Sequence, residues 1–525
     1  MSQPTTIPAL LHEAAARHAG IAALEDAGER IDYAELPERA AAVARGLLAA
    51  GIAKGDRVAL WAPNTSRWVL AALGIHLAGG VLVPLNTRMK GREASDILRR
   101  SGARLLFLAG DFLGQDYPAL LDGLVPETLE RRVLLGERDA APLSGLTAWE
   151  AFLAEGEAVE AAAVEARAAS LGPEDLSDLL FTSGTTGAPK GVMSEHGQNL
   201  RAFGEYIRVI GLRPGDRYLV INPFFHAFGY KAGWLSCLLA GATILPQAVF
   251  DAAAVLERIE RERISVLPGP PTLYLSLLAE PRLAEADLSS LRVAVTGSAS
   301  IPPILIRRMR EELGFAVVTT AYGLTECGGL ATLCDPAADA ETIATTSGRA
   351  IAGTEVSIRD SRGAALAAGE SGEICLRGFH VMRGYFDHPE ATAEAIDAAG
   401  WLHTGDVGSL DAAGNLRITD RLKDMFIVGG FNCYPAEIEA MLVEHPRIAQ
   451  CAVIGVPDER LGEVGCAFVV PTAGPPPSAE SLIAWARRQM ANYKAPRHMR
   501  LVERLPVNAS NKVVKPALRR LFDQG

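Results

Sequence analysis

Cysteines are scarce in this sequence, and their placement excludes two kinds of stabilised fold. Seven cysteines are spread over 525 residues without a Cys-x-x-Cys pair or a Cys/His cluster at zinc spacing, which excludes the common zinc folds. An odd, scattered set is typical of reduced thiols rather than of a disulfide framework. The seven are Cys237, Cys327, Cys334, Cys375, Cys433, Cys451 and Cys466.

A targeting or membrane-spanning segment is also missing from the pattern. The first residues lack the basic start and the apolar centre of a signal peptide, and their apolar positions suit one face of an amphipathic helix. The most apolar stretch, residues 69–85, is interrupted by three glycines, a histidine and a proline, which favours a buried helix followed by a strand. We therefore expect a soluble, cytoplasmic protein without a membrane span. The residues of the N-terminal apolar face are Leu10, Leu11, Ala14 and Ala15.

The chain has no surplus of basic residues. Its formal net charge is −11 and no run of Lys or Arg stands out, which argues against binding to a nucleic-acid backbone. An anionic ligand would have to be held by a local site. The sequence also contains no GxxxxGK followed by Ser or Thr, so the phosphate loop of ordinary P-loop ATPases is excluded.

Helical and strand-like patterns alternate through most of the chain. With 525 residues, the chain exceeds the size at which one hydrophobic core stops growing, so at least two domains are expected. The alternation predicts parallel sheets flanked by helices, with ligands at the carboxyl ends of strands. The expected helices cover 34–50 and 92–100 and start at Ser66; the expected strands cover 57–61, 81–83, 104–107, 218–221, 242–245, 264–267 and 291–295.

Two later segments depart from this alternation. Residues 348–378 form short alternating segments punctuated by glycines, which predicts a small antiparallel element. After about Asp420 another compact unit begins, with a helix opened by Pro435 and a second helix through Trp485. Strands are expected near 451–454 and 466–470. About a hundred residues suffice for an independent small domain.

Residues 182–191 read Thr-Ser-Gly-Thr-Thr-Gly-Ala-Pro-Lys-Gly, the composition of a loop that wraps phosphate. The glycines permit backbone conformations in which successive N–H groups converge on an anion, the hydroxyls add neutral donors, and Lys190 supplies the one full charge. A solvated linker of the same composition is the alternative. The glycines are Gly184, Gly187 and Gly191, and the hydroxyl residues are Thr182, Ser183, Thr185 and Thr186.

Six further motifs follow this loop in order, and together they favour the phosphate-binding interpretation. They are Gly297-Ser298-Ala299 after an apolar strand, Ala321-Tyr322-Gly323-Leu324-Thr325-Glu326, Trp401-Leu402-His403-Thr404-Gly405-Asp406, Asp420-Arg421-Leu422-Lys423-Asp424, Gly429-Gly430-Phe431-Asn432 and Asn508-Ala509-Ser510-Asn511-Lys512. With these motifs the chain resembles the adenylate-forming superfamily, which includes acyl-CoA synthetases, firefly luciferase and the adenylation domains of peptide synthetases.

The resemblance covers nearly the whole chain and implies an α/β fold with two domains. Residues 1–420 would form a large N-terminal domain with parallel α/β subdomains and a small β-barrel-like element, and residues 421–525 a small, mobile α+β lid joined near Lys423. The implied activity is that of an AMP-forming acyl-CoA synthetase. ATP converts a carboxylate into an acyl adenylate and releases pyrophosphate, and the CoA thiolate then displaces AMP. The ligands are thus ATP, Mg²⁺, CoA and a small carboxylic acid, while the choice between monomer and homodimer stays open.

The resemblance also implies a role for each motif. The loop at 182–191 would hold the β- and γ-phosphates, and Thr325 would donate to the α-phosphate. Glu326 would supply a hard oxygen to Mg²⁺, which needs only one or two carboxylates beside phosphate oxygens. The ribose hydroxyls would bind Asp406, with Arg421 as a second nucleotide contact. The adenine pocket would be formed by Gly297, Ser298, Ala299, Tyr322 and Gly323, with the Tyr322 ring as a π-face.

Taken singly, these side chains have plainer interpretations. Tyr322 suits a core aromatic, Glu326 a carboxylate at a helix N-terminus, and Asp406 a turn former after Gly405. Their joint occurrence in one order favours the nucleotide site.

Lys512 is the residue that the resemblance makes catalytic, through neutralising charge between the carboxylate and the α-phosphate. A solvated surface lysine is the alternative. The local Ser-Asn-Lys departs from the family's usual Ser-Gly-Lys, and Asn tolerates left-handed backbone better than most residues, so the turn is expected to persist. For the second half-reaction the lid would rotate at Lys423. Gly429 and Gly430 would then replace Lys512 and let the CoA arm approach.

The segments 222–231 and 267–272 occupy the family's acid-binding positions, and both are apolar and aromatic. No carboxylate stands ready for a substrate ammonium, and a phosphopantetheine carrier motif is missing, so a non-amino acid and free CoA are expected. His226 borders the substrate carboxylate in the family, although a packed core histidine is the alternative. These runs resemble bacterial synthetases that activate the indanedione propanoate left after steroid ring degradation, and His226 or Lys231 would then meet a ring ketone.

Three other functions stay open from the sequence. A medium- or long-chain fatty acyl-CoA ligase shares every motif and differs in pocket shape. A catalytically silent nucleotide-binding protein would have little reason to keep both Lys190 and Lys512. A luciferase-like oxidation requires a special substrate and ranks last.

Overall fold

The structure, a computed structural model, describes residues 4–138, 144–182, 189–297, 301–421, 424–428, 431–458, 461–490, 492–507 and 513–524. Two compact units make up the chain. The first comprises Met1–Glu355 and Leu376–Leu402, and the second comprises Val356–Cys375 and His403–Gly525. The domain boundary between residues 420 and 421 stays a prediction.

An eight-stranded sheet forms one layer of the first unit. Its order is β20 (Gly384–Tyr385), β11 (Lys190–Glu195), β10 (Leu176–Thr182), β4 (Val81–Pro84), β3 (Arg57–Trp61), β5 (Leu105–Leu108), β8 (Arg131–Leu134) and β9 (Leu146–Ala148). The strands from β10 to β9 pair in parallel, whereas β11 pairs antiparallel with both of its neighbours. The antiparallel edge thus places the two strands that flank the glycine-rich loop side by side.

Helices alternate with these strands as the sequence predicts. They are α2 (Leu36–Ala49), α3 (Ser66–Leu77) and α4 (Gly91–Ser101), which in the chain lie before β3, between β3 and β4, and between β4 and β5. Every residue of α3 except Arg67 is buried, because this helix is apolar on nearly all sides and packs inside the unit. The stretch 69–85 is therefore a buried helix and strand, as expected.

A second run of strands carries the later motifs. Its order is β2 (Glu29–Asp32), β1 (Ala22–Asp26), β13 (Thr243–Pro246) and β12 (Arg217–Val220), and Val266 bridges β12 to β14 (Val293–Thr296), β15 (Val317–Tyr322), β16 (Thr332–Leu333) and β17 (Arg349–Ala350). The strand expected over 264–267 is reduced to this one bridge at Val266. Pro268 has no N–H to donate, although the N–H groups of Leu267 and Gly269 on either side of it still donate to the Val293 and Val295 carbonyls.

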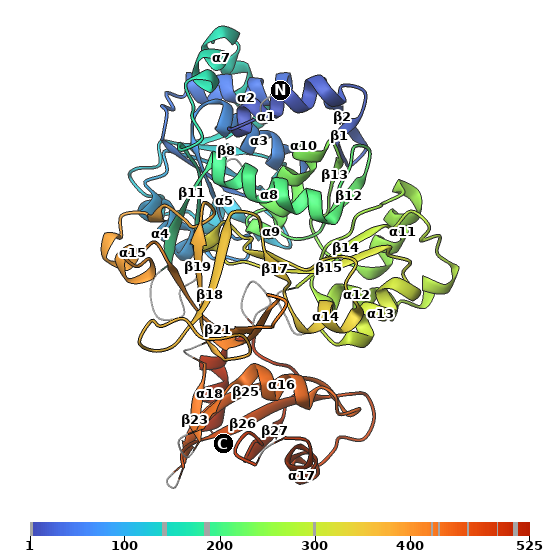
Figure 1. The fold of residues 1–525 in the computed structure, drawn as a ribbon. Helices are drawn as coiled ribbons and strands as arrows, with labels where there is room; N and C mark the ends of the chain where they lie inside the picture. Colours follow the sequence, from blue (N-terminus) through green and yellow to red (C-terminus); the bar gives the residue numbers. More distant parts are fainter. Residues whose placement is uncertain are drawn as a thin grey trace. The chain divides into compact units, whose positions relative to one another are not determined.

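Helices cover the end of this sheet that holds β14 and β15 (Figure 1). They are α11 (Ala252–Glu262), α12 (Pro271–Leu278), α13 (Pro303–Glu311) and α14 (Ala340–Thr345). The other elements of the first unit are α1 (Ile7–His18), α5 (Tyr117–Leu120), α6 (Trp149–Gly156), α7 (Ala161–Ala169), α8 (His196–Ile210), α9 (Ala227–Gly229), η1 (Tyr230–Leu235), α10 (Ser236–Ala240), η2 (Pro281–Glu285), η3 (Thr325–Cys327), α15 (Pro389–Ala395) and the hairpin of β6 (Asp111–Phe112) with β7 (Gln115–Asp116). Flanked, largely parallel sheets confirm the predicted α/β class.

The second unit is built from two sheets. One has the order β18 (Thr354–Arg359), β19 (Gly372–Gly378), β21 (Leu402–Leu410) and β22 (Leu416–Arg421). The other runs β24 (Phe431–Cys433), β23 (Phe426–Val428), β26 (Gly462–Pro471) and β25 (Ile448–Asp458), with β27 (His498–Leu501) paired to β26. Its helices include α16 (Pro435–Leu442), α17 (Ala479–Gln489) and α18 (Lys515–Asp523). The helix predicted to open at Pro435 begins at that residue.

Neither disulfides nor membrane-spanning helices are found among the described residues. All seven cysteines are free thiols, and all but the half-buried Cys451 are buried. Among the helices that the structure describes, none combines the length and apolarity needed to cross a bilayer.

Three buried histidines give the first unit a pH-dependent stability. His76, His196 and His380 are at most 1% exposed, and burial lowers the pKa of each, to about 4 for His196 and His380. His196 accepts a hydrogen bond at Nδ1 from the Ile7 N–H, which requires the neutral ring.

The free energy of unfolding is therefore expected to be largest above pH 6.5 and to fall as the pH drops toward 4, because the unfolded histidines protonate near 6.5 and the folded ones do not. Between pH 6.5 and about pH 5, His196 and His380 each contribute a loss of roughly 2 kcal/mol. Urea unfolding at the two pH values measures it. His380→Asn is expected to flatten the dependence, and a pH-independent unfolding free energy would contradict the assignment.

Candidate functional site

The two ends of the phosphate-loop motif lie side by side. β10 ends at Thr182 and β11 begins at Lys190, and these two residues are partners in the antiparallel ladder. The close approach at the base of the hairpin is helped by Gly191, where an added Cβ would lie 3.0 Å from the Phe181 ring. The predicted residues between the strands lie outside the described residues; they are Ser183, Gly184, Thr185, Thr186 and Gly187.

The adenine-pocket motifs meet at another strand edge. β14 and β15 pair in parallel, so Gly297 and Tyr322 leave the sheet at the same carboxyl edge. Tyr322 ends β15 and is 8% exposed. An added Cβ at Gly323 would lie 2.3 Å from the carbonyl carbon of Gly329, so the turn after Tyr322 requires glycine. Ser298 and Ala299 lie outside the described residues.

Tyr385 connects the predicted magnesium carboxylate to the phosphate loop. Thr325 and Glu326 begin the short helix η3, and the Tyr385 hydroxyl donates to Glu326 Oε1 at 2.9 Å. The Lys190 ammonium lies 5.0 Å from the centroid of the same tyrosine ring, a cation–π distance. Burial, followed by the Glu326 carboxylate, raises the pKa of Tyr385, so its hydroxyl stays protonated and donating. Nothing in the sequence pattern singled out Tyr385, because its partners are far away in the chain.

The two predicted acid-binding segments contact each other. The Asn222 side-chain amide donates to the Pro268 carbonyl at 3.2 Å. His226 immediately precedes the short helix α9, is exposed, and has its ring 4.7 Å from the buried Phe225 ring. The alternative of a packed core histidine is therefore wrong.

Lys231 does not reach a substrate ketone, and this corrects the expectation from the sequence. Its side chain is 0% exposed, and its ammonium lies 3.2 Å from Asp178 Oδ1. It also donates to Ser194 Oγ at 3.0 Å. A signal was present in the sequence: Asp178 and Lys231 are opposite charges within apolar runs, a pattern that requires a buried partner.

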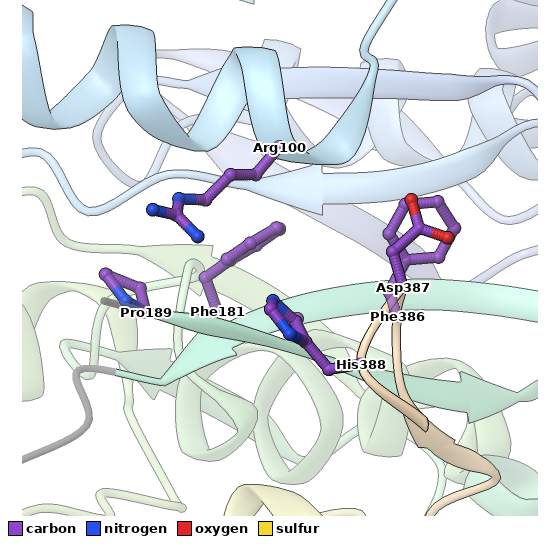
Figure 2. Close-up of a pocket in the computed structure, with 7 residues that line it drawn as sticks. Arg100, Phe181, Pro189, Phe386, Asp387 and His388 are labelled. Carbon is purple, nitrogen blue, oxygen red and sulfur yellow. The ribbon is translucent and has the colours of Figure 1, made fainter. Parts of the chain in front are cut away.

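A pocket of about 210 Å³ lies beside the base of the phosphate-loop hairpin (Figure 2). Its lining combines Arg100 of α4 with residues of the hairpin and of the turn after β20: Phe181, Pro189, Gly191, Phe386, Asp387 and His388. The volume is below the roughly 300 Å³ of a typical small-molecule site, and none of the predicted acid-binding residues lines it. This pocket is therefore not the acid site.

In the second unit, Asp406 and Arg421 are brought together. They are Cα partners in the antiparallel ladder of β21 and β22, 15 positions apart in the chain. Asp406 is 5% exposed, and its N–H donates to Thr404 Oγ1 at 3.0 Å. The positive φ of 67° at Gly405 explains the glycine before it.

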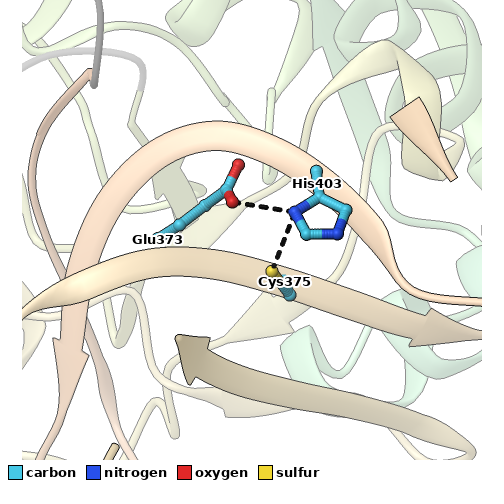
Figure 3. Close-up of side chains that lie close together, drawn as sticks. All are labelled: Glu373, Cys375 and His403. Atoms are coloured by element: carbon cyan, nitrogen blue, oxygen red, sulfur yellow. Dashed lines mark hydrogen bonds and ion pairs between the residues drawn. The ribbon is translucent and has the colours of Figure 1, made fainter. Parts of the chain in front are cut away.

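Glu373, Cys375 and His403 gather below this turn, with their ligand atoms within 4.8 Å of one another (Figure 3). The His403 Nδ1 atom lies 2.8 Å from Glu373 Oε2 and 3.6 Å from Cys375 Sγ. The first distance is that of a hydrogen bond, shorter than the roughly 3.3 Å between ligand atoms on tetrahedral zinc. Glu373 Oε1 also accepts from the Gly405 N–H at 3.1 Å. The cluster therefore holds the turn that carries Asp406, and sequence reasoning missed Glu373.

Four predicted residues of the C-terminal part, Lys423, Gly429, Gly430 and Lys512, lie outside the described residues. Their flanks are described. Val507 pairs antiparallel with Val513, immediately after Lys512 in the chain, and Val428 pairs with Phe431 around the two glycines. Gly429, Gly430 and Lys512 thus lie, in the chain, between residues that pair with each other.

Family profiles match both parts of this arrangement. Residues 11–386 match the AMP-binding enzyme family, and residues 437–512 match the AMP-binding enzyme C-terminal domain. The chain therefore belongs to the family of AMP-binding, adenylate-forming enzymes.

Individual relatives indicate which kind of AMP-binding enzyme this chain resembles. The chain is 51% identical over 518 residues to the 3-[(3aS,4S,7aS)-7a-methyl-1,5-dioxo-octahydro-1H-inden-4-yl]propanoyl:CoA ligase of Mycobacterium tuberculosis, which covers 98% of this chain and 99% of the relative. It is 49% identical over 523 residues to the ligase of the same name from Rhodococcus jostii, covering 98% and 99%. Among solved structures, the anthranilate CoA ligase AuaEII in complex with anthranoyl-AMP superposes with a TM-score of 0.85 at 28% identity, covering 99% and 98%. These matches confirm the prediction of an AMP-forming acid–CoA ligase that uses ATP and CoA.

Proposed function

We propose that this ligase activates a bicyclic, ketone-bearing propanoate of the indanedione type. The observation that carries the proposal is the 51% identity over 98% of the chain to a ligase named for that acid. The medium-chain acyl-CoA ligase of Homo sapiens is 33% identical over 94% of the chain, so the fatty-acid alternative has weaker support. The apolar segments 222–231 and 267–272, joined by the Asn222 hydrogen bond to Pro268, would wall the acid site.

The first unit would hold the triphosphate and its metal ion. The loop at 182–191 and Lys190 would bind the β- and γ-phosphates, and Thr325 the α-phosphate. Glu326 fits Mg²⁺, because its Oε1 accepts from Tyr385 and its Oε2 is a hard oxygen of the kind Mg²⁺ takes. Mg²⁺ bound there would neutralise phosphate charge. The adenine would lie against Tyr322, between the backbones of Gly297, Ser298, Ala299 and Gly323.

The second unit would supply the ribose contacts and the catalytic lysine. Asp406, fixed by the Glu373 hydrogen bonds to its turn, would accept from the ribose hydroxyls, with Arg421 beside it. Residues 421–525 would act as a lid that turns at Lys423 and presents first Lys512 and then Gly429 and Gly430. The lid would thereby separate the two half-reactions. A cytoplasmic location fits substrates such as ATP and CoA.

The purified protein is expected to turn over the ring-bearing propanoate with a kcat/KM at least about 100-fold above that for palmitate, because a site shaped for a bicycle and its ketones rejects an unbranched chain. CoA-dependent release of AMP across a panel of acids measures this preference. Octanoate serves as the medium-chain member of the panel.

The proposed contact between His226 and a ring ketone is tested by His226→Phe, which keeps an aromatic ring and removes the polar nitrogens. This variant is expected to lower kcat/KM for the diketone acid more than kcat/KM for octanoate. Equal turnover of palmitate and the ring-bearing acid by the unaltered protein would remove the basis of the proposed substrate.

A further inference from the structure

A fully buried ion pair lies beneath the motifs of the first unit. The side chains of Asp178 and Lys231 are both 0% exposed, with 3.2 Å between Oδ1 and Nζ. The ammonium also donates to Ser194 Oγ at 3.0 Å. The three residues come from β10, η1 and β11.

The other oxygen of the Asp178 carboxylate accepts two hydrogen bonds. Asp178 Oδ2 accepts from Ser177 Oγ at 2.7 Å and from the Asn199 amide at 2.8 Å. Asp178 Oδ1 accepts no hydrogen bond from the described residues, and the Lys231 ammonium is its ion-pair partner. The neighbouring histidines do not supply a second positive charge, because burial lowers the pKa of His196 to about 4 and that of His76 well below its usual value. Lys231 therefore balances Asp178.

The Asp178–Lys231 pair connects the strands that flank the phosphate-loop motif with the proposed acid-binding segment. β10 leads into the phosphate loop and β11 leads out of it, so Asp178 and Ser194 lie on its two stems. Lys231 closes the acid-binding segment 222–231. The short helix η3, which carries Thr325 and Glu326, also contacts β11.

Backbone contacts confirm that these segments touch. An added Cβ at Gly329, just after η3, would lie 2.8 Å from the Ala227 side chain in the acid-binding segment. η1 is a π-helix in which Gly233 has φ −86° and ψ −107°, outside helical values. Such π-helical turns are frequent at functional sites. Lys231 lies in this turn, with its side chain inside the unit.

Stability alone does not explain a buried ion pair. Removing two charges from water is costly, and well-packed apolar residues of similar volume often serve a fold equally well. Unlike an apolar contact, the hydrogen bond from Lys231 to Ser194 is directional, and together with the ion pair to Asp178 it fixes η1 in one position against the stems of the loop.

We propose that Asp178 and Lys231 are positioning residues that fix the acid-binding segment against β10 and β11, the strands on either side of the phosphate-loop motif, so that the substrate carboxylate meets the α-phosphorus of ATP. In that step a carboxylate oxygen bonds to the α-phosphorus as its bond to the pyrophosphate oxygen breaks, and the ion pair exchanges no proton. The inference rests on the proposed role of residues 222–231.

The test compares the double variant Asp178→Asn/Lys231→Met with Lys231→Met alone. The single variant leaves a buried carboxylate unpaired and is expected to lower Tm. The double variant removes both charges at similar volume and is expected to recover most of that Tm. Its kcat for acid-dependent pyrophosphate–ATP exchange is expected to stay about 10- to 100-fold below that of the unaltered protein, because small misplacement of reacting groups is costly. The KM values for ATP and acid should change by less than about threefold.

Two further variants keep the test decisive. Ser194→Ala removes the hydrogen bond to Lys231 without leaving a charge, and is expected to lower kcat with little change in Tm. Asp216→Asn is the matched control, since Asp216 is 5% exposed, pairs with Arg292 and lies before β12, away from the loop stems. It is expected to lower Tm and leave kcat unchanged.

The proposal is overturned if the double variant regains kcat together with Tm, or if Ser194→Ala and Asp216→Asn behave alike. Every assay uses the acid that the unaltered protein turns over fastest. A failure of the proposed substrate then appears in the unaltered protein, and a failure of the positioning role appears only between variants.

Discussion

Lys512→Ala is expected to slow adenylate formation by about 100- to 1,000-fold, the usual effect of removing one preorganised charge-stabilising donor. In the proposed mechanism its ammonium neutralises the charge that builds up as the carboxylate approaches the α-phosphate. The same variant should still convert a supplied acyl adenylate to the thioester at a rate near that of the unaltered protein, because the lid has by then replaced Lys512 with Gly429 and Gly430. Pyrophosphate exchange reports the first half-reaction, and thioester formation from synthetic adenylate reports the second.

Arg519→Ala is the control, since it removes an exposed positive charge from α18 in the same C-terminal segment. Both of its half-reactions are expected to match those of the unaltered protein. Equal losses in the two half-reactions of Lys512→Ala would refute the assignment of Lys512 to adenylation.

Glu326→Gln is expected to lower adenylation by a similar factor, about 100- to 1,000-fold, and to shift its dependence on Mg²⁺ to higher concentration. The amide keeps the shape of the side chain and can still accept from the Tyr385 hydroxyl, but it lacks the charge that Mg²⁺ prefers. Pyrophosphate exchange as a function of Mg²⁺ measures both effects. Water-proton relaxation with Mn²⁺ measures metal binding independently of turnover.

Tyr385→Phe tests how much the hydrogen bond to Glu326 contributes to adenylation. It removes the hydrogen bond to Glu326 and keeps the ring that faces Lys190. The rate of adenylation is expected to fall about 10-fold, which corresponds to the loss of one hydrogen bond to a charged group. If Glu326→Gln left the Mg²⁺ dependence unaltered, Glu326 would not be the metal carboxylate.

Local patterns in the sequence were sufficient to predict the alternating helices and strands. β3 covers Arg57–Trp61 as expected, and α16 begins at Pro435. The expected strand over 264–267 is shorter than predicted, since its apolar residues are buried but only Val266 forms parallel bridges. Burial and strand pairing are separate properties, and apolar runs report only the first.

The site was predicted through motifs, each of which carries chemistry within a few residues. Side chains whose partners are distant in the chain were not predicted. Tyr385 reaches Glu326 over 59 positions, and Glu373 reaches Gly405 over 32. Lys231 was assigned to the substrate from its neighbours in the chain, whereas the π-helical turn places it in the interior. Contacts of this range depend on strand order, which a local pattern does not contain.

The hydrogen bond between Asn222 and the Pro268 carbonyl constrains how selectivity for an acid can be transplanted. A chimera that exchanged residues 222–231 alone would leave its pocket wall tied to a foreign segment, with mismatched packing on both sides. Residues 267–272 would have to be moved in the same exchange. Directed evolution of this scaffold toward new acids should therefore randomise both stretches in one library rather than in successive rounds.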